Sequence, residues 1–236
     1  MKPSTHIALF LALTLTGPLL AAGGSKPKVD NNKKGALLYE TCKVCHGDKG
    51  QGNTYIEGPS INGLPEWYLI STLTKFKNGI RGAHPDDKRG LNMRPMARAL
   101  KGKEEIEAVA KHIASLSPVT PQPTLKGGDA EKGKALFVTC TACHGNDGAG
   151  NPIDAVPSIL KGPPLNNLPD WYIVNQLKKF KSGIRGTHPK DTEGASMRPM
   201  AMALPDEKAM IDLTAYIATL KAPTKTEAKK AEPAQH

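Results

Sequence analysis

Two cysteine pairs are the residues best placed to do chemistry, because a histidine follows each pair directly. The two runs are Cys42-Lys43-Val44-Cys45-His46 and Cys140-Thr141-Ala142-Cys143-His144. A Cys-x-x-Cys-His run is the attachment signature of c-type haem. Two thiols at this spacing can add to the two vinyl groups of one porphyrin, and the adjacent imidazole then reaches the iron from one face. The sequence therefore predicts two covalent haem c groups, with both histidines as iron ligands.

Three other interpretations of these cysteines compete with haem attachment. A zinc site would join the two pairs, but 98 residues separate them and the histidines would be left over. A thioredoxin-like redox pair expects a βαβ pattern, and none is visible. A simple disulfide gives the repeated histidine no role. Haem attachment is the interpretation that uses all three residues of both runs.

A methionine is the expected sixth ligand of each iron, since a thioether raises the potential in electron carriers. Met-Arg-Pro-Met occurs twice, at 93–96 and at 197–200. If the chain reaches each haem as a loop and the proline then fixes its direction, the methionine before the proline is favoured as the ligand. These methionines are Met93 and Met197. Met96 and Met200 are the alternative, and would otherwise pack inward at the start of the next turn.

Other histidines and methionines are less favoured as iron ligands. His84 and His188 are also duplicated, each before a proline, so ligation by two histidines is a rival arrangement. We expect a structural role or a contact with a haem propionate for both. Met202 and Met210 have no counterparts and are expected to fill gaps in the core.

Self-comparison shows that the chain is a repeat of two. The cysteine runs are offset by 98 residues, and residues 64–100 return at 168–204 with 23 of 37 positions identical. The second copy has six additional residues between Asn151 and Gly162. We predict a first domain at 32–117, a second at 129–221, and a linker at 118–128. Prolines at the start of this linker stiffen it and prevent a continuous helix.

The two ends of the chain are expected to lie outside the folded domains. Residues 1–22 combine Lys2 with an apolar run and small residues, which predicts a secretory signal peptide and export to the periplasm. An uncleaved anchor is the alternative, although the apolar run is short against the roughly 20 residues that span a bilayer. Residues 222–236 are rich in Ala, Lys, Glu and Pro and are expected to be a disordered tail.

The elements that must position these residues are helices, and the predicted fold class is all-α. One helix should lead into each cysteine run, and Gly35 shares a face with Tyr39, where it would let another helix cross closely. A second helix should follow Pro65, and a third should run from about Glu104 to Leu116. The segment between them, which carries Met93, is expected to be irregular.

Charge bears on partners rather than on fold. Lys and Arg exceed Asp and Glu by 10, and residues 23–118 hold 16 basic and 10 acidic residues, net +6. Residues 119–221 hold 12 and 10, net +2. Lys75, Lys77 and Arg81 end one predicted helix, and its counterpart ends with Lys178, Lys179, Lys181 and Arg185. These residues form either a solvated face, favoured by the negative end of the helix dipole, or a docking surface for an acidic redox partner. We expect Lys75, Lys77 and Arg81 to form such a docking surface. Nucleic acid is not an expected partner of an exported haem protein.

Over about 32–220, each half resembles a class I cytochrome c, and the whole resembles the dihaem cytochromes of the c4 type. The resemblance rests on the two cysteine runs and on the Met-Arg-Pro-Met-Ala-x-Ala-Leu runs. In that family the ligand methionine stands seven residues before a leucine, which implies Met93 and Met197. The family also has a proline whose carbonyl accepts a hydrogen bond from the ligand histidine, which implies Pro59 and Pro163.

The resemblance and the residues together predict a periplasmic electron carrier rather than an enzyme. Two six-coordinate haems would pass electrons between redox proteins of a respiratory chain, such as an oxidase, a reductase or a dehydrogenase. The alternative is a haem-bearing subunit of a periplasmic dehydrogenase or other redox enzyme, which needs an open or displaceable ligand at one haem. No stable membrane insertion is expected.

Overall fold

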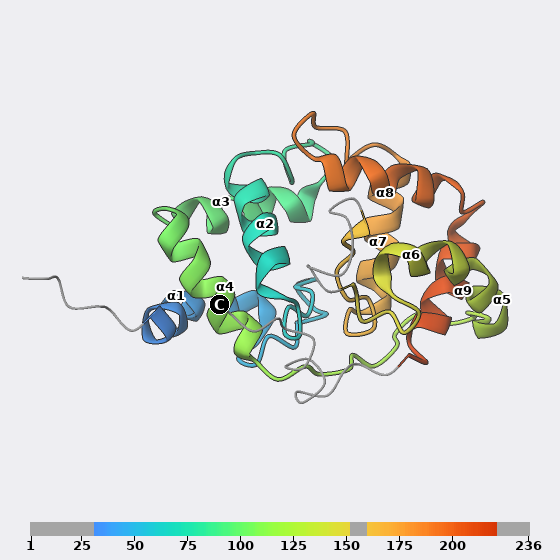
Figure 1. Cartoon of the computed structure of the whole chain (residues 1–236), viewed down its shortest axis with the longest axis horizontal. Coiled ribbons are helices and arrows are strands. Elements are labelled where there is room, and N and C mark those ends of the chain that lie inside the picture. Colours follow the sequence, from blue (N-terminus) through green and yellow to red (C-terminus); the bar gives the residue numbers. More distant parts are fainter. Residues whose placement is uncertain (1–30, 152–159, 221–236) are drawn as a thin grey trace, which may run out of the picture.

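The computed structural model describes residues 31–151 and 160–220 of the chain (Figure 1). The predicted signal peptide, the predicted tail and most of the six-residue insertion lie outside the described residues. Within the described residues the regular elements are helices, and one isolated bridge joins Asn53 to Gly58. The prediction of an all-α fold is confirmed.

Four helices form the first unit, which occupies one side of the molecule in Figure 1. They are α1 (Asn31–His46), α2 (Glu66–Lys77), α3 (Lys88–Ala99) and α4 (Lys103–Ser115). Their core joins buried side chains of α1, α2 and α4, among them Tyr39, Phe76 and Val109. This core is where α1 packs on α4 and α2 packs on both α3 and α4.

The close crossing of α1 and α4 depends on Gly35. A Cβ at this position would overlap the Ala108 carbonyl oxygen and lie 2.8 Å from the Cβ of His112. Only a residue without a side chain lets the two helices come this near, as the sequence analysis predicted. Gly133 has the same place in the second unit, against the carbonyl of Asp212.

The second unit has corresponding helices on the other side of the molecule (Figure 1). They are α5 (Ala130–Phe137), α6 (Thr141–His144), α7 (Asp170–Lys181), α8 (Thr192–Met202) and α9 (Glu207–Ile217). A short 3₁₀ turn at Val138–Cys140 separates α5 from α6, so the segment that is one helix in the first unit is broken in the second. The core of the second unit includes Phe137, Phe180 and Met210. Met210 fills the interior, as expected.

The expectation of an irregular segment around Met93 is wrong, because this methionine lies in the middle of α3. Buried Asp87 precedes α3 and accepts a hydrogen bond from the Gly90 amide at 3.0 Å, which is an N-cap. Pro95 lies inside the helix, and the corresponding α8 contains Pro199. Glycine and proline in this segment disfavour a helix, but the cap allows one to begin.

Polar contacts join the two units. The hydroxyl of buried Ser60 donates to the backbone carbonyl of Asn167 at 2.7 Å, and the side-chain amide of Asn167 donates to the backbone carbonyl of Asn62 at 2.7 Å. Leu168 packs against both hydrophobic cores. Figure 1 shows α2 and α7 on the facing sides of the two units, with α3 and α8 at the same end of the molecule.

The connecting segment after α4 has no helix, as its prolines predicted, and it is held by one carboxylate. Buried Asp170, the first residue of α7, accepts from the Thr124 and Leu125 amides, each at 2.6 Å. The connection is therefore fixed to the second unit. Among the described residues, no helix has the length and apolar character needed to cross a bilayer.

Candidate functional site

The imidazole of His46 is held at the end of α1 by one backbone contact. Its Nδ1 lies 2.8 Å from the carbonyl oxygen of Pro59, which is the bond implied by the resemblance. A carbonyl can only accept, so Nδ1 carries the proton and donates it. The other ring nitrogen, Nε2, then keeps its lone pair, which is the form that binds a metal.

The second unit repeats this arrangement. His144 Nδ1 donates to the Pro163 carbonyl at 2.7 Å. The glycine before each proline lets the loop approach the histidine: a Cβ on Gly162 would lie 2.7 Å from His144 Nδ1, and one on Gly58 would overlap the Cys45 carbonyl oxygen. Both loops thus bring a proline carbonyl to the imidazole because a glycine precedes it.

Burial sets the charge state of the two histidines. Both rings are buried, which lowers the pKa of His46 and of His144, although the bond to the proline carbonyl opposes this effect. A neutral imidazole is the ligand that iron requires, because a protonated ring has no lone pair to donate. The protein therefore holds both rings neutral and oriented.

The four cysteines are free thiols at the edge of the two cores. None of them forms a disulfide in the structure, and Cys45 is exposed while the other three are half-buried. Burial raises the pKa of Cys42 to about 11, and burial also raises the pKa of Cys140. The disulfide interpretation of the cysteines is thus not what the structure contains, and all four sulfurs are available for thioether bonds.

The structure separates the two methionines of each Met-Arg-Pro-Met run. Met93 packs against the first core together with Cys42, and Met197 packs against the second core together with Cys140. Met96 is 45% exposed and Met200 is 44% exposed. The two exposed methionines do not pack inward, contrary to the expectation for them, and neither does Met202, which is 58% exposed.

His84 and His188, the rival ligands, lie in loop turns. His84 Nδ1 accepts from the Asp86 amide at 3.2 Å, and His188 Nδ1 accepts from the Lys190 amide at 3.1 Å. The side chain of His84 is 40% exposed, whereas Met93 and Met197 pack against the two cores. The geometry therefore favours the methionines.

The residues present fit haem on three grounds. In each unit one cysteine thiol and one methionine thioether pack against the same core, and a buried imidazole directly follows the cysteine pair. Sulfur and imidazole nitrogen are the ligand atoms of c-type haem iron. Buried Nε atoms of Arg94 and Arg185 have no hydrogen-bond partner among the described residues, and the haem propionates are acceptors of the right charge. The described residues also hold no group of three His, Cys, Asp or Glu side chains arranged for a metal ion, which argues against the zinc interpretation.

Two arginines, Arg81 and Arg185, lie between the units. Arg81 is buried over the Phe76 ring, with its guanidinium carbon 4.6 Å from the ring centroid. It donates to the Tyr172 hydroxyl at 2.9 Å and to Gln176 at 3.2 Å, both in the other unit. Arg185 lies over Phe180 in the same manner, at 4.4 Å.

These guanidiniums change the acidity of a tyrosine at the interface. Burial raises the pKa of Tyr68, but the positive charges of Arg185 and Arg81 outweigh burial and lower the pKa to about 8. Two guanidinium groups thus lie at the contact between the units, and a positive charge of this kind suits the carboxylates of haem propionates.

The expected docking surface of Lys75, Lys77 and Arg81 is wrong, because these residues are engaged inside the molecule. Lys75 pairs with Asp191 at 2.6 Å and with Glu193 at 2.7 Å in the other unit. Lys77 donates to the Leu100 carbonyl, and Arg81 is buried. Basic residues at the end of a helix therefore serve the fold and the contact between units.

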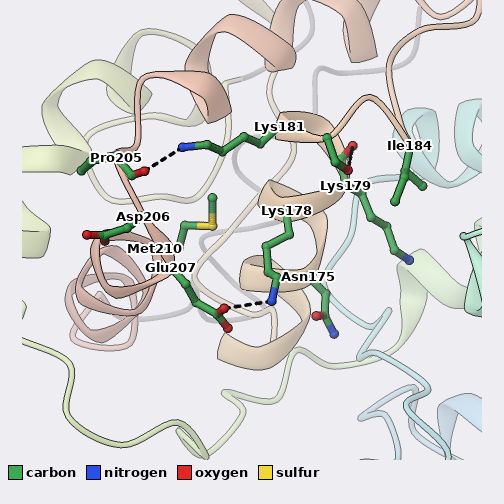
Figure 2. A pocket seen from close by; sticks show the side chains of 10 residues that line it. Asn175, Lys178, Lys179, Lys181, Ile184, Pro205, Asp206, Glu207 and Met210 are labelled. Atoms are coloured by element: carbon green, nitrogen blue, oxygen red, sulfur yellow. Dashed lines mark hydrogen bonds and ion pairs between the residues drawn. The ribbon is translucent and has the colours of Figure 1, made fainter.

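The matching lysines of the second unit border a hollow of about 500 Å³ at the end of α7 (Figure 2). Lys178 pairs with Glu207 at 3.0 Å, and Lys181 donates to the Pro205 carbonyl at 3.0 Å. Figure 2 shows Lys179 extending away from this hollow. Its Nζ lies 2.6 Å from Asp87 of the first unit. None of the residues lining the hollow is one of the predicted haem residues.

Sequence reasoning missed the residues that join the units. Asp87, Asp191, Tyr68 and Tyr172 were not singled out, although each has its counterpart in the other repeat. The sequence did offer one signal for these residues, because polar side chains are present in both copies at positions that do not bind haem. This signal does not show that the residues pair across the two units.

Comparison with known proteins agrees with this geometry. The family model for cytochrome c matches the chain twice, at residues 32–117 and 130–221. Each match contains one Cys-x-x-Cys-His run, so the chain carries two covalent haem c groups.

Two curated relatives are subunits or partners of redox enzymes. The FixP subunit of the Cbb3-type cytochrome c oxidase of Bradyrhizobium diazoefficiens is 28% identical over 80% of this chain and 68% of its own length. The thiosulfate dehydrogenase electron acceptor of Thiomonas intermedia is 28% identical over 80% of this chain and 83% of its own length. Other oxidase subunits, from Rubrivivax gelatinosus and a Bradyrhizobium species, are covered over only 34% and 58% of their length.

A solved structure of the whole architecture is also similar. Reduced recombinant cytochrome c4 from Pseudomonas stutzeri matches with a TM-score of 0.59 and 25% identity, over 80% of this chain and 98% of that protein. The match spans nearly the whole of that protein and most of this chain. The chain belongs to the cytochrome c family, as a dihaem protein similar to cytochrome c4.

Proposed function

We propose that the protein is a dihaem electron carrier of the periplasm. The observation that carries the proposal is the pairing, in each unit, of a buried neutral histidine with a methionine that packs into the same core as an attachment cysteine. Haem with a histidine and a methionine ligand supplies one-electron transfer at a raised potential. The chain's own residues bind the group, orient the ligands and exclude water.

Each residue has an assigned part in this proposal. The four cysteines form the thioether bonds, and His46 and His144 bind the two irons through Nε2. Met93 and Met197 supply the sixth ligands from α3 and α8. The carbonyls of Pro59 and Pro163 fix the imidazole rings through Nδ1, which keeps Nε2 aimed at the iron.

The proposal also covers the organisation of the chain. The two haem domains are assigned to 32–117 and 129–221, with the linker at 118–128. Residues 1–22 are assigned as a signal peptide, which would place the protein in the periplasm where covalent haem attachment is carried out. The protein is proposed to act by transfer between proteins and not as an enzyme.

Redox proteins are the proposed partners, and the net charge of +6 in residues 23–118 favours partners with acidic surfaces. The lysines at the ends of α2 and α7 are engaged in internal contacts, so the encounter would use other exposed basic side chains. In the first unit these include Lys49, Lys88, Arg98, Lys101 and Lys103. Electron-transfer rates with an acidic partner are expected to fall as salt rises.

A second candidate function is a haem-bearing subunit of a larger redox enzyme. It is favoured by the similarity to the FixP subunit of an oxidase and to the electron acceptor of a thiosulfate dehydrogenase. Such a role is compatible with the same axial ligands if the chain only relays electrons. A catalytic role instead requires a haem with a displaceable ligand.

A redox titration of the purified protein, followed optically and by EPR, tests the proposal. Two low-spin haems with histidine and methionine ligands are expected. The reduced protein is also expected to bind carbon monoxide slowly and incompletely at both haems, because neither iron has a free position. Rapid binding of one equivalent of carbon monoxide would instead favour an enzyme.

A further inference from the structure

One carboxylate in each unit has two partners at once. Asp87 Oδ1 accepts from the Gly90 amide at 3.0 Å, which begins α3. The same oxygen lies 2.6 Å from Nζ of Lys179, which belongs to α7 of the other unit. Asp87 is buried and the side chain of Lys179 is 19% exposed, so water weakens this ion pair little.

The reciprocal contact uses the corresponding residues. Asp191 Oδ1 accepts from the Gly194 amide at 3.2 Å at the start of α8, and it lies 2.6 Å from Nζ of Lys75 on α2. Lys75 has a second partner in this place, Glu193, at 2.7 Å. Each unit thus sends a lysine to the cap of the helix that carries the other unit's methionine.

Close packing leaves the capped turn little freedom. A Cβ on Gly90 would lie 2.6 Å from the Cα of Gly82, and one on Gly194 would meet the carboxylate of Asp191. Gly82 follows Arg81, which itself reaches Tyr172 of the other unit at 2.9 Å. The Asp87 carboxylate is thus in close contact with the first turn of α3, and its displacement is expected to disturb that turn.

From these contacts we infer that the two units hold each other's axial methionine in place. Lys179 positions Asp87, Asp87 positions the first turn of α3, and α3 presents Met93 six residues further along the chain. Lys75 acts in the same way on Asp191, α8 and Met197. The inference rests on the proposed function, since it takes Met93 and Met197 as the ligands. Lys75, Lys179, Asp87 and Asp191 are positioning residues in this account, because none of them is assigned as a ligand.

Two variants with opposite changes of charge test the inference in the full-length holoprotein. Lys179→Met removes a positive charge, which by electrostatics alone lowers a nearby potential. Asp87→Asn removes a negative charge, which alone raises it, while the asparagine can still cap α3. Both variants break the same ion pair.

If Lys179 positions Met93, both variants have the same effect on ligation at the first haem. Each is expected to weaken that haem's far-red methionine-to-iron charge-transfer band and to shift the NMR signal of its bound methionine methyl group in the reduced protein. Hydrogen exchange at the Gly90 amide is expected to become faster in Lys179→Met. The methyl signal of the second haem should stay in place.

Matched variants separate this effect from a general loss of charge or stability. Lys178→Met removes the neighbouring lysine, whose partner Glu207 lies in its own unit, and should leave both haem signals unchanged. Lys75→Met should transfer the effect to the second haem. Unchanged band and methyl signals in Lys179→Met and Asp87→Asn, with potentials that move in opposite directions, would overturn the inference.

Failure of the ligand assignment is distinguishable from failure of the coupling. The variants Met93→Ala and Met197→Ala identify which methyl signal belongs to which haem. If Met93→Ala leaves the band of the first haem intact, the assignment of the ligand fails. If Met93→Ala abolishes the band but Lys179→Met does not alter it, only the coupling between units fails.

Discussion

At the scale of single residues, the proline carbonyls explain how the same short motif is made ready for iron twice. The bond from Nδ1 of His46 to Pro59 fixes both the ring and its tautomer, and His144 has the same bond to Pro163. A histidine without this partner could rotate or carry its proton on the other nitrogen. The loop, and not the motif alone, thus decides which nitrogen faces the iron.

The two methionines of each run differ in burial, and this difference predicts their substitution. Met93→Ala should abolish the far-red charge-transfer band at one haem and lower its potential, because a thioether ligand stabilises ferrous iron. Met96→Ala should keep the band, since Met96 is 45% exposed and lies on the outer side of α3. Optical spectra of the oxidised protein during a redox titration provide the measurement. A band lost in Met96→Ala and kept in Met93→Ala would assign ligation to the second methionine.

At the scale of elements, the segment that carries the methionine shows the limit of local patterns. Residues 88–99 contain a glycine and a proline, which argued for a loop, yet they form α3. The Asp87 cap satisfies a backbone amide at the start of the helix. Packing of α3 on α2 then stabilises a sequence of low helix propensity.

The crossing of α1 and α4 predicts a sharp difference between two glycines. Gly35→Ala should lower the free energy of unfolding by about 1–3 kcal/mol, because the new methyl group overlaps the Ala108 carbonyl and must push the helices apart. Gly102→Ala should cost less than about 1 kcal/mol, since a Cβ there meets no atom within 4 Å. Urea unfolding of the holoprotein measures both values. Equal costs at the two positions would show that the crossing can relax without loss.

At the scale of the whole molecule, the contact between the units includes buried polar groups whose hydrogen-bond partners lie in the other unit. The buried backbone carbonyl of Asn167 accepts from the Ser60 hydroxyl, and the side-chain amide of Asn167 donates to the Asn62 carbonyl. A buried polar group that loses its partner costs about 1–3 kcal/mol. The two units are therefore expected to unfold together.

Removing one of these hydrogen bonds tests this expectation. Ser60→Ala should lower the stability by about 1–3 kcal/mol, since it leaves the Asn167 carbonyl buried and unpaired. The chain has two tryptophans, Trp67 in the first unit and Trp171 in the second. Variants that retain only one of them report each unit separately through fluorescence during urea unfolding.

Both reporters should move to lower urea concentration by the same amount in Ser60→Ala. The control is Ser115→Ala, because exposed Ser115 donates only to the His112 carbonyl of its own helix. If the Trp67 midpoint falls while that of Trp171 stays, the units unfold independently and the contact between them adds no cooperativity.

The sequence alone determined the features that depend on a few neighbouring residues. The spacing of two cysteines and a histidine predicted the haem attachment, the apolar periodicity predicted helices without strands, and Gly35 predicted a close helix crossing. All of these follow from geometry within one or two turns of the chain, where residue spacing translates directly into position. The segment around Met93 departed from this, because its helix depends on a cap and on packing, and the exposure of Met96, Met200 and Met202 also differs from expectation.

Tertiary structure decided which charged residues face solvent. Lys75 and Arg81 belong to the docking surface expected from the sequence, but their partners, like that of Lys179, lie 91 to 118 residues away in the other unit. Two homologous units can be joined through many different faces, and the repeat itself does not specify which. The pairing of each lysine with the opposite aspartate therefore exists only once the two units have docked, which is why no local pattern could reveal it.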